Sequence, residues 1–235
     1  MVYVTSDLHG YPLDKLKDFL DKVGFCNNDF LYILGDVIDR GPDGIKILKW
    51  LMLQPNVELL LGNHEAMMLA CDFLFDEITE DSISKLTGTK LNTYMTWVSN
   101  SGQVTLNALS GVRSQEIRYI LEYLRESPLY EVLTVNDRDF VLVHSGLGGF
   151  RKDKKLATYT PDDLLWTRPD LNTKYFDDIT VIFGHTPTVH YGDEHLGKIV
   201  TTDTWVNVDV GVGLGQEPCL LRLNDMKEIY YKDLK

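Results

Sequence analysis

The stretch FLYILGDVIDRG, Phe30 to Gly41, joins an apolar run to a charged cluster without a break. An apolar run of this length that ends at a glycine is typical of a buried strand followed by a turn. Two aspartates and an arginine follow at once, and charged groups beside a buried strand need partners. The stretch therefore predicts a strand that delivers Asp36, Asp39 and Arg40 to a functional site.

The same arrangement recurs along the chain. Four further apolar runs end in a short polar cluster, namely Val2–Val4 before SDLHG, Val57–Leu61 before GNHE, Phe140–Val143 before HSG and Ile179–Phe183 before GHT. Apolar residues at helical spacing lie between them, over 12–23, 43–53 and 65–126, the last with breaks near 87–89 and 110–111. Shorter strand-like runs return at Val206–Val210, Cys219–Leu223 and Glu228–Tyr231. Strands alternating with helices predict an α/β fold, a mixed β-sandwich flanked by helices.

The length of 235 residues fits one domain. Within it, residues 66–125 are expected to form a helical, cap-like insertion beside the site. We interpret its apolar residues, Trp97 among them, as packing, because nothing in the segment indicates a substrate.

Composition narrows the class of protein. The 44% apolar and 25% charged content is ordinary for a soluble globular chain, and no apolar run approaches the roughly 18–20 residues that span a bilayer. No basic region precedes an apolar stretch at the N-terminus, so we expect a cytoplasmic monomer without a secretory signal and without a membrane partner. The net charge of −12 argues against nucleic acid as a partner.

The three cysteines, Cys26, Cys71 and Cys219, form no CxxC pair. They indicate neither a disulfide framework nor a thiolate zinc site. We expect them to be small buried residues.

The polar clusters contain a set of metal ligands. Ligands of α/β sheets bind beyond the carboxyl ends of strands, so the five clusters are expected to converge. Residues two apart in an extended segment point the same way, about 6.5–7 Å apart, so Asp7 and His9 can address one cation. The other candidates follow the remaining strands, namely Asp36, Asn63, His144 and His185. Carboxylate, imidazole and amide ligands favour manganese, iron or zinc over calcium.

Two ions can share a bridging carboxylate, and we choose Asp36 for that position, with the ions roughly 3.5–4 Å apart. By itself Asp7-x-His9 is typical of a turn, and the joint occurrence of the clusters is what indicates a site. Gly10 is expected to let the chain pass close to it. His190 and His195 lie in a polar stretch, and we exclude them as loop residues.

In this order, SDLHG, GDVIDRG, GNHE, VHSGL and FGHTP resemble the motifs of the calcineurin-like metallophosphoesterases. They are most similar to the phosphoprotein phosphatase branch in its bacterial and phage-type form. The resemblance extends from Val2 to about Gly215, with Ser6 in place of the usual glycine and Ile38 in place of valine. It implies the metallophosphoesterase fold.

The resemblance also implies roles for single residues. Two divalent ions are implied, manganese first and iron, zinc, nickel or cobalt as alternatives. The first would be held by Asp7, His9 and Asp36, and the second by Asp36, Asn63, His144 and His185.

Four more residues resemble parts of the family's catalytic apparatus. His64 is similar to the general acid, with Asp39 as its carboxylate partner. Arg40 and, within LLWTRP, Arg168 are similar to arginines that bind the phosphoryl oxygens. Asp209, in NVDVG, is either a partner of a metal-bound histidine or a turn residue, and both interpretations stay open.

These residues suit the hydrolysis of a phosphomonoester. A hydroxide held between two ions would attack, the ions and arginines would neutralise the phosphoryl oxygens, and His64 would protonate the leaving group. Bound cations and the two arginines would outweigh the three carboxylates of Asp7, Asp36 and Asp39, so the site can attract an anion although the chain is acidic.

Three functions are weighed. A serine/threonine or dual-specificity protein phosphatase comes first, acting on a phosphorylated protein or a small phosphoester, because GDVIDRG and Glu65 favour that branch. A symmetrical dinucleoside tetraphosphate hydrolase shares the same motifs and is the alternative. A catalytically dead binding protein of the same fold is disfavoured, because every expected ligand is present.

Overall fold

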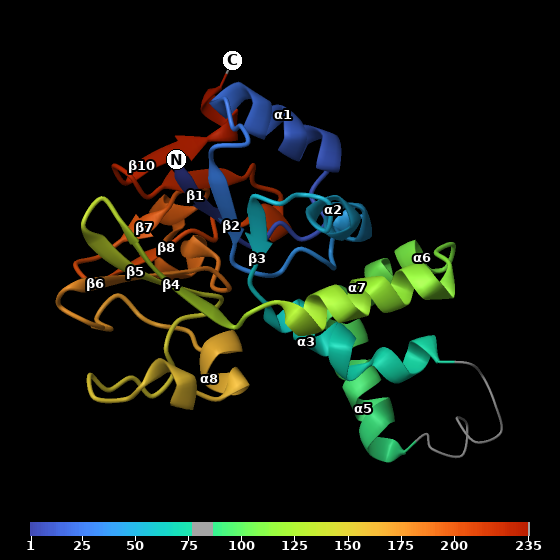
Figure 1. Cartoon of the computed structure of the whole chain (residues 1–235). Helices are drawn as coiled ribbons and strands as arrows, with labels where there is room; N and C mark the ends of the chain where they lie inside the picture. The colour runs from blue at the N-terminus through green and yellow to red at the C-terminus, as the bar shows by residue number, and fades with distance from the viewer. Residues whose placement is uncertain (77–86, 235) are drawn as a thin grey trace.

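The computed structural model describes residues 1–76 and 87–234. Two mixed five-stranded sheets lie together, with helices around them, as Figure 1 shows. The predicted α/β fold with a mixed β-sandwich core is thus confirmed. The part of the expected helical insertion at 77–86 lies outside the described residues.

The first sheet has the strand order β10-β9-β1-β2-β3. Its strands are β1 (Val2–Thr5), β2 (Phe30–Ile33), β3 (Val57–Leu59), β9 (Cys219–Arg222) and β10 (Lys227–Tyr230). β1 pairs with β2, and β2 with β3, in parallel. The carboxyl ends of these three strands therefore lie at one edge.

The second sheet has the order β4-β5-β6-β8-β7. Its strands are β4 (Tyr130–Val135), β5 (Arg138–Val143), β6 (Ile179–Phe183), β7 (Val200–Thr201) and β8 (Trp205–Asn207). β5, β6 and β8 are parallel neighbours, so their carboxyl ends also share an edge.

The sequence pattern missed β4 and β7, extended β3 two residues too far and extended β8 three residues too far. β4 pairs with β5 through a tight turn in which Asn136 and Asp137 both have positive φ, 51° and 58°, the backbone of a type I′ hairpin. β7 has two residues, too few for a pattern. The run Val206–Val210 ends as a strand at Asn207, because the Asn207 side chain accepts a hydrogen bond from the backbone of Asp209 at 2.8 Å.

The helices have apolar faces as expected. They are α1 (Leu13–Val23), α2 (Gly44–Leu51), α3 (Asn63–Ala70), α5 (Gly88–Trp97), α6 (Gln103–Leu109), α7 (Ser114–Glu126) and α8 (Pro161–Leu165). α3, α5, α6 and α7 gather on the β3 side of the first sheet (Figure 1). The expected breaks are found before α5 and after α6, but the kink at Val98–Gly102 (η2) was not predicted. None of the described helices has the length and apolar character needed to cross a membrane.

The larger core lies between the two sheets, with Phe140 and Ile182 from the second sheet, and extends to the helices, where it includes Trp97. A smaller core lies at the second sheet around Phe183 and Trp205. Cys71 and Cys219 are buried as predicted, but the prediction for Cys26 was wrong. Cys26 is exposed because it lies in a polar turn after α1, where its backbone N–H donates to the Asp29 carboxylate at 3.0 Å.

Candidate metal centre

The two sheets meet at the carboxyl ends of their central strands. Nδ1 of His144, after β5, donates a hydrogen bond to the carbonyl of Leu34, after β2, at 2.6 Å. The backbone N–H of His185, after β6, donates to the Asp7 carboxylate, after β1, at 2.9 Å. The predicted convergence of the strand-end clusters is therefore present.

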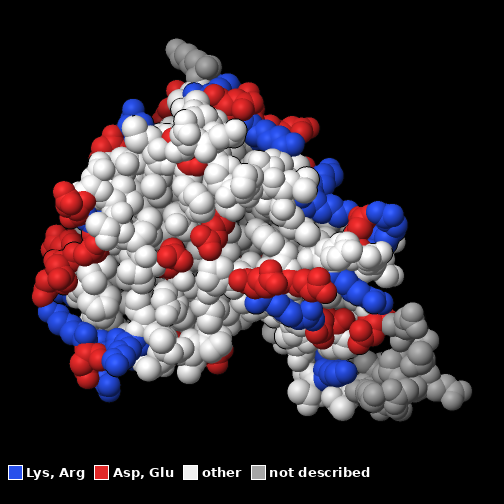
Figure 2. Space-filling model, viewed as in Figure 1, with Lys and Arg blue, Asp and Glu red and all other residues white. Residues whose placement is uncertain are grey.

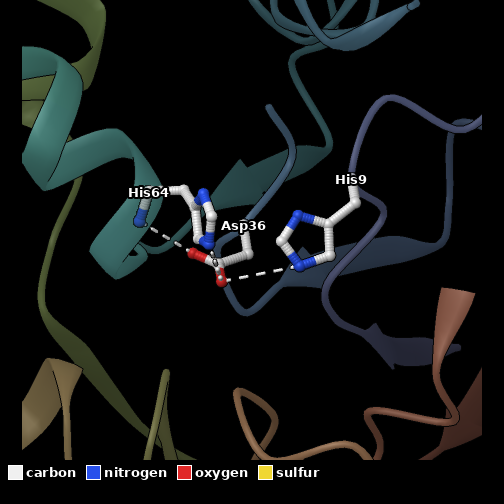
Figure 3. Close-up of side chains that lie close together, drawn as sticks. All are labelled: His9, Asp36 and His64. Carbon is white, nitrogen blue, oxygen red and sulfur yellow. Dashed lines mark hydrogen bonds and ion pairs between the residues drawn. The ribbon is translucent and has the colours of Figure 1, made fainter. Parts of the chain in front are cut away.

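Asp36 lies at the centre of the cluster and is 2% exposed. Its Oδ2 atom is 3.8 Å from Nε2 of His9 and 3.8 Å from Nε2 of His64, and these side chains point toward one another in Figure 3. Its Oδ1 atom is 3.5 Å from Nε2 of His144. Because each carboxylate oxygen faces a different set of imidazoles, Asp36 has the geometry of a bridging ligand.

Two overlapping sets of ligand atoms share Asp36. In the first set, atoms of His9, Asp36 and His64 lie within 4.8 Å of one another, and in the second the same holds for Asp36, His144 and His185. Nε2 of His185 is buried and has no hydrogen-bond partner within the described part of the chain. A buried nitrogen of this kind needs a partner, and a cation at the second set would provide one.

Asn63 and Asp7 complete these sets. Oδ1 of Asn63 lies 2.8 Å from Nε2 of His144, and Oδ1 of Asp7 lies 3.8 Å from Nε2 of His9. The other Asp7 oxygen accepts hydrogen bonds from Ser6 and His185. The structure thus brings together all six side chains that the sequence indicated as ligands.

The histidine rings are oriented for metal binding. Nδ1 of His9 donates to the carbonyl of Ile38 at 3.1 Å, as Nδ1 of His144 does to Leu34. Such a bond fixes the ring so that Nε2 faces the cluster. Burial lowers the pKa of His9 to about 3 and that of His185 to about 2, so both rings are neutral and can bind a cation.

The carboxylates repel one another. Burial and the charge of Asp36 raise the pKa of Asp7 to about 6, and burial and the charge of Asp7 raise the pKa of Asp209 well above its usual value. Burial works against the ionised form of Asp36, but the surrounding histidines outweigh it and hold the pKa of Asp36 below the usual range. Divalent cations would relieve this repulsion, so the donor set fits a two-metal centre.

Asp209 is a turn residue. Its carboxylate accepts a hydrogen bond from the backbone N–H of Gly211 at 3.0 Å. Among the described residues, the ring partners of His9 and His144 are backbone carbonyls instead. This geometry supports the turn interpretation left open above.

The backbone at the site is unusual. Six site residues have positive φ, namely Asp7 (52°), His9 (41°), Asp36 (53°), Asp39 (67°), Arg40 (63°) and His185 (64°). This region is costly for residues other than glycine and often marks a functional site. Bonds between the loops hold it, such as that from the backbone N–H of His9 to the carbonyl of Asp36 at 2.8 Å.

Gly10 also has a role in packing between loops. A Cβ at Gly10 would lie 2.1 Å from the carbonyl oxygen of Gly41. Gly10 therefore lets the first loop pack against the second.

Glu65 has a role that sequence reasoning missed. Its buried carboxylate accepts backbone N–H bonds from Asp36 and Val37, each at 2.8 Å, from Ile38 at 3.2 Å and from Gly62 at 3.1 Å. It therefore holds the loop that carries the central aspartate. A glutamate three residues after a helix N-cap is a visible signal for the Gly62 bond, but nothing in the sequence indicates the other three.

His64 and Asp39 form the expected pair, with Nδ1 of His64 2.6 Å from Oδ2 of Asp39. Burial opposes the protonated ring, but the charges of Asp36 and Asp39 outweigh it and raise the pKa of His64 to about 9. His64 therefore carries a proton at neutral pH, with Nε2 directed at the cluster.

An open cavity of about 530 Å³ adjoins the cluster. Its lining includes Arg40, Arg168 and His185 together with Pro169, Pro187, His190 and Leu214. Nη1 of Arg168 donates to the carbonyl of His185 at 3.2 Å and lies 3.3 Å from the Thr186 hydroxyl. The short helix Thr188–Tyr191 brings His190 to the cavity wall, but His190 belongs to neither set of ligand atoms, in line with its exclusion as a ligand.

A scan against protein-family models matches residues 1–211 to the calcineurin-like phosphoesterases. A symmetrical bis(5'-nucleosyl)-tetraphosphatase of Buchnera aphidicola is 29% identical over 191 residues, 74% of this chain and 59% of its own length. A second, from Wigglesworthia glossinidia brevipalpis, is 29% identical over 62% of this chain and 44% of its own. The chain thus spans about three fifths or less of these two relatives.

A further relative aligns over more of its length. The asymmetrical bis(5'-nucleosyl)-tetraphosphatase PrpE of Oceanobacillus iheyensis is 25% identical over 91% of this chain and 85% of its own. Because these relatives are tetraphosphatases, the expected placement in the phosphoprotein phosphatase branch lacks support, whereas the wider superfamily is confirmed.

Solved structures share the fold. A candidate diadenosine tetraphosphatase has a TM-score of 0.65 at 18% identity, covering 97% of this chain and 91% of its own. A serine/threonine phosphatase from Saccharomyces cerevisiae has a TM-score of 0.58 at 14% identity, covering 97% and 78%. The family model matches residues 1–211, which include the strand-end loops of both sheets. The chain therefore belongs to the calcineurin-like phosphoesterases.

Proposed function

We propose that the chain is a metal-dependent phosphoester hydrolase whose substrate is a dinucleoside tetraphosphate. The names of the relatives support this choice over the protein phosphatase that GDVIDRG and Glu65 favoured. Glu65 does not distinguish the two, because its buried carboxylate is engaged by backbone N–H groups of Asp36 and Val37.

The observation that carries the proposal is the cavity beside the cluster. Arg40 and Arg168 place two guanidinium groups there, and each can bind two phosphate oxygens at once. Pro169, Pro187 and Leu214 add apolar surface to the same wall. Charged groups for a phosphate chain beside apolar surface for a base suit a nucleoside polyphosphate.

The ligands for two divalent cations, manganese first, would be Asp7, His9, Asp36, Asn63, His144 and His185. When bound, the ions would supply positive charge to the phosphoryl oxygens and lower the pKa of the attacking water. Their charge, with that of the arginines, would also allow a protein of net charge −12 to attract a polyanion, although acidic side chains lie at many places on the face that Figure 2 shows.

His64 would act as the general acid. The attacking water would lose one proton to solvent as it forms a bond to phosphorus. As the bond to the leaving oxygen breaks, Nε2 of His64 would give its proton to that oxygen, and His64 would then regain a proton from solvent. Asp39 accepts the Nδ1–H bond at 2.6 Å and so keeps Nε2 directed at the reacting group.

Hydrolysis of phosphorylated serine, threonine or tyrosine in a protein is a second candidate. Its support is the exposure of both Arg40 and Arg168 at an open cavity, where a phosphorylated side chain on a protein surface can reach them.

The deciding experiment compares diadenosine tetraphosphate, a phosphopeptide and a small aryl phosphate in buffer with manganese. We expect the highest kcat/KM for diadenosine tetraphosphate, and loss of turnover after chelation. ADP as the only nucleotide product indicates symmetrical cleavage, whereas AMP with ATP indicates asymmetrical cleavage. A kcat/KM for the phosphopeptide at least about tenfold higher, a difference of about 1.4 kcal/mol, would overturn the proposal in favour of the second candidate.

The role of His64 has its own test. His64→Asn should lower kcat on poorly activated esters by about 100-fold or more, while both ions remain bound by elemental analysis. His195→Asn is the matched control, because His195 ends the short helix Asp193–His195 and its Nε2 lies 3.8 Å from Glu194, outside both sets of ligand atoms. Unchanged turnover of His64→Asn would show that the general acid lies elsewhere.

A further inference from the structure

We infer that Trp97 and Thr105, from the helical segment, are positioning residues that hold the Asp39 carboxylate and thereby direct His64. The inference rests on the role of His64 given under the proposed function. No motif of the family resemblance includes either residue, and the sequence indicated Trp97 only as packing.

Both oxygens of Asp39 are engaged. Oδ2 accepts a hydrogen bond from Nε1 of Trp97 at 2.9 Å, beside the bond to His64. Oδ1 accepts one from the Thr105 hydroxyl at 2.5 Å. The carboxylate is thus fixed from two sides and cannot turn away from the imidazole without losing a bond.

Thr105 also fixes the backbone. Its hydroxyl oxygen accepts the backbone N–H of Asp39 at 3.0 Å while donating to the side chain of the same residue. Because Asp39 has a positive φ of 67°, this bond helps to maintain a costly backbone conformation. Trp97 and Asp39 are fully buried and Thr105 is 3% exposed, so water does not replace these bonds.

A kink brings the two residues to one carboxylate. Trp97 is the last residue of α5 and Thr105 lies in α6, eight positions later. In an unbroken helix these positions would be about 12 Å apart along the axis. The wide turn Val98–Gly102 lies between them, with Ser101 at φ 75°, and interrupts the helix with a kink. Such interruptions are frequent at functional sites.

Gly102 supports this arrangement. A Cβ there would lie 2.6 Å from Cδ1 and Nε1 of the Trp97 indole. The turn therefore packs directly on the group that donates to Asp39. Packing alone would explain a buried tryptophan, but not two separate donors converging on the partner of the proposed general acid.

The test uses variants that keep the shape and remove the hydrogen bond, Trp97→Phe and Thr105→Val. Trp205→Phe is the matched control, because Trp205 is also fully buried and its indole donates to a carbonyl, that of Thr173, at 3.0 Å. Each variant is assayed with manganese on aryl phosphates whose leaving phenols differ in pKa.

We expect Trp97→Phe and Thr105→Val to lower kcat about 10-fold to 100-fold on phenyl phosphate, part of what a general acid contributes. The loss should be small on dinitrophenyl phosphate, whose leaving group needs no proton, and KM should change little. Thr105→Ser, which restores the hydroxyl, should recover most of the rate. Trp205→Phe should lower thermal stability, and any change in its kcat should be the same for all leaving groups.

A second readout needs no turnover. The proton on Nδ1 of His64 should give a downfield proton NMR signal, and Trp97→Phe and Thr105→Val should shift or broaden it while Trp205→Phe leaves it in place. Equal losses on all leaving groups, together with an unmoved signal, would refute the positioning role.

The two hypotheses fail differently. If His64→Asn shows no dependence on the leaving group, the role of His64 is wrong. If His64→Asn shows it and the Thr105 variants do not, the inference about the helical segment is wrong. Should Trp97→Phe fail to fold, Thr105→Val and Thr105→Ser decide.

Discussion

The strand-end loops and the helical segment contribute to the same site in different ways. The loops after β1, β2, β5 and β6 carry charged side chains on a strained backbone, and Asp7, Asp36 and His185 all have positive φ there. The helices α5 and α6 have ordinary backbone and reach the site through the interior, with Trp97 and Thr105. The candidate ligands thus lie next to strand ends, whereas Trp97 and Thr105, which donate hydrogen bonds to Asp39, lie within helices.

The two regions also differ in what maintains them. Trp97 belongs to the same apolar core as the first sheet, so packing supports the helices. The loops instead gather buried carboxylates and imidazoles, and burial, together with the charge of Asp36, raises the pKa of Asp7. We therefore expect the loops to depend on bound cations and the helices to depend on packing.

The largest effect is expected for Asp36→Asn. Asp36 is the one residue common to both ligand sets, and an amide cannot bridge two cations as a carboxylate does. Turnover should fall more than about 1000-fold, since each cation contributes several kcal/mol, and elemental analysis should show the loss of both ions. Asp14→Asn, on the exposed face of α1, is the control. Retention of two ions by Asp36→Asn would contradict the bridging geometry.

His9→Asn and His185→Asn should separate the two sides of the centre. His9 belongs to one ligand set and His185 to the other. Each variant should retain about one ion instead of two, and should lose about 100-fold or more in kcat. Metal titration of the two proteins side by side provides the measurement. Loss of both ions in either variant would show that the sets are not independent.

Glu65→Gln tests the loop that Glu65 holds. An amide has one acceptor oxygen for the four backbone N–H groups that now bond to the carboxylate. We expect metal affinity to fall about 10-fold to 100-fold, the usual effect of changing a group that supports the ligands, with a lower melting temperature. Glu58→Gln, on the neighbouring strand β3, is the control. Unchanged metal affinity would show that the loop keeps its position without Glu65.

The smallest effect is expected for Leu214→Ser at the cavity wall. Leu214 is 53% exposed and lines the cavity with the arginines. Removing its apolar surface should raise KM for diadenosine tetraphosphate a few-fold, a change of about 1 kcal/mol. KM for a small aryl phosphate should not change. An equal rise for both substrates would indicate that this wall does not contact a base.

Much of the fold was predictable because apolar runs mark buried strands. β6 has the predicted bounds, and β1, β2, β5 and β9 differ from them by one or two residues. β4 and the kink at Val98–Gly102 were not predictable in the same way. β4 pairs locally with β5 across Asn136 and Asp137, but its mixed burial gives no apolar run. The kink interrupts a segment whose helical pattern is continuous in the sequence.

The sequence by itself determined which residue types follow which strands. The order of the strands and their parallel pairing then carried Asp7, Asp36, Asn63, His144 and His185 to one place, because parallel strands end at a common edge. The chemistry of the ligand set could be predicted for the same reason, because each ligand lies in a short loop directly after a strand.

Only the tertiary structure decided what surrounds that set. It brought the carboxylate of Glu65 onto the Asp36 loop, placed His190 at the cavity and directed Trp97 and Thr105 at Asp39. Each of these contacts depends on packing between elements that are distant in the chain. The hydrogen-bond donors to a buried carboxylate come from elements that the fold brings close to it, so no local sequence pattern predicts them.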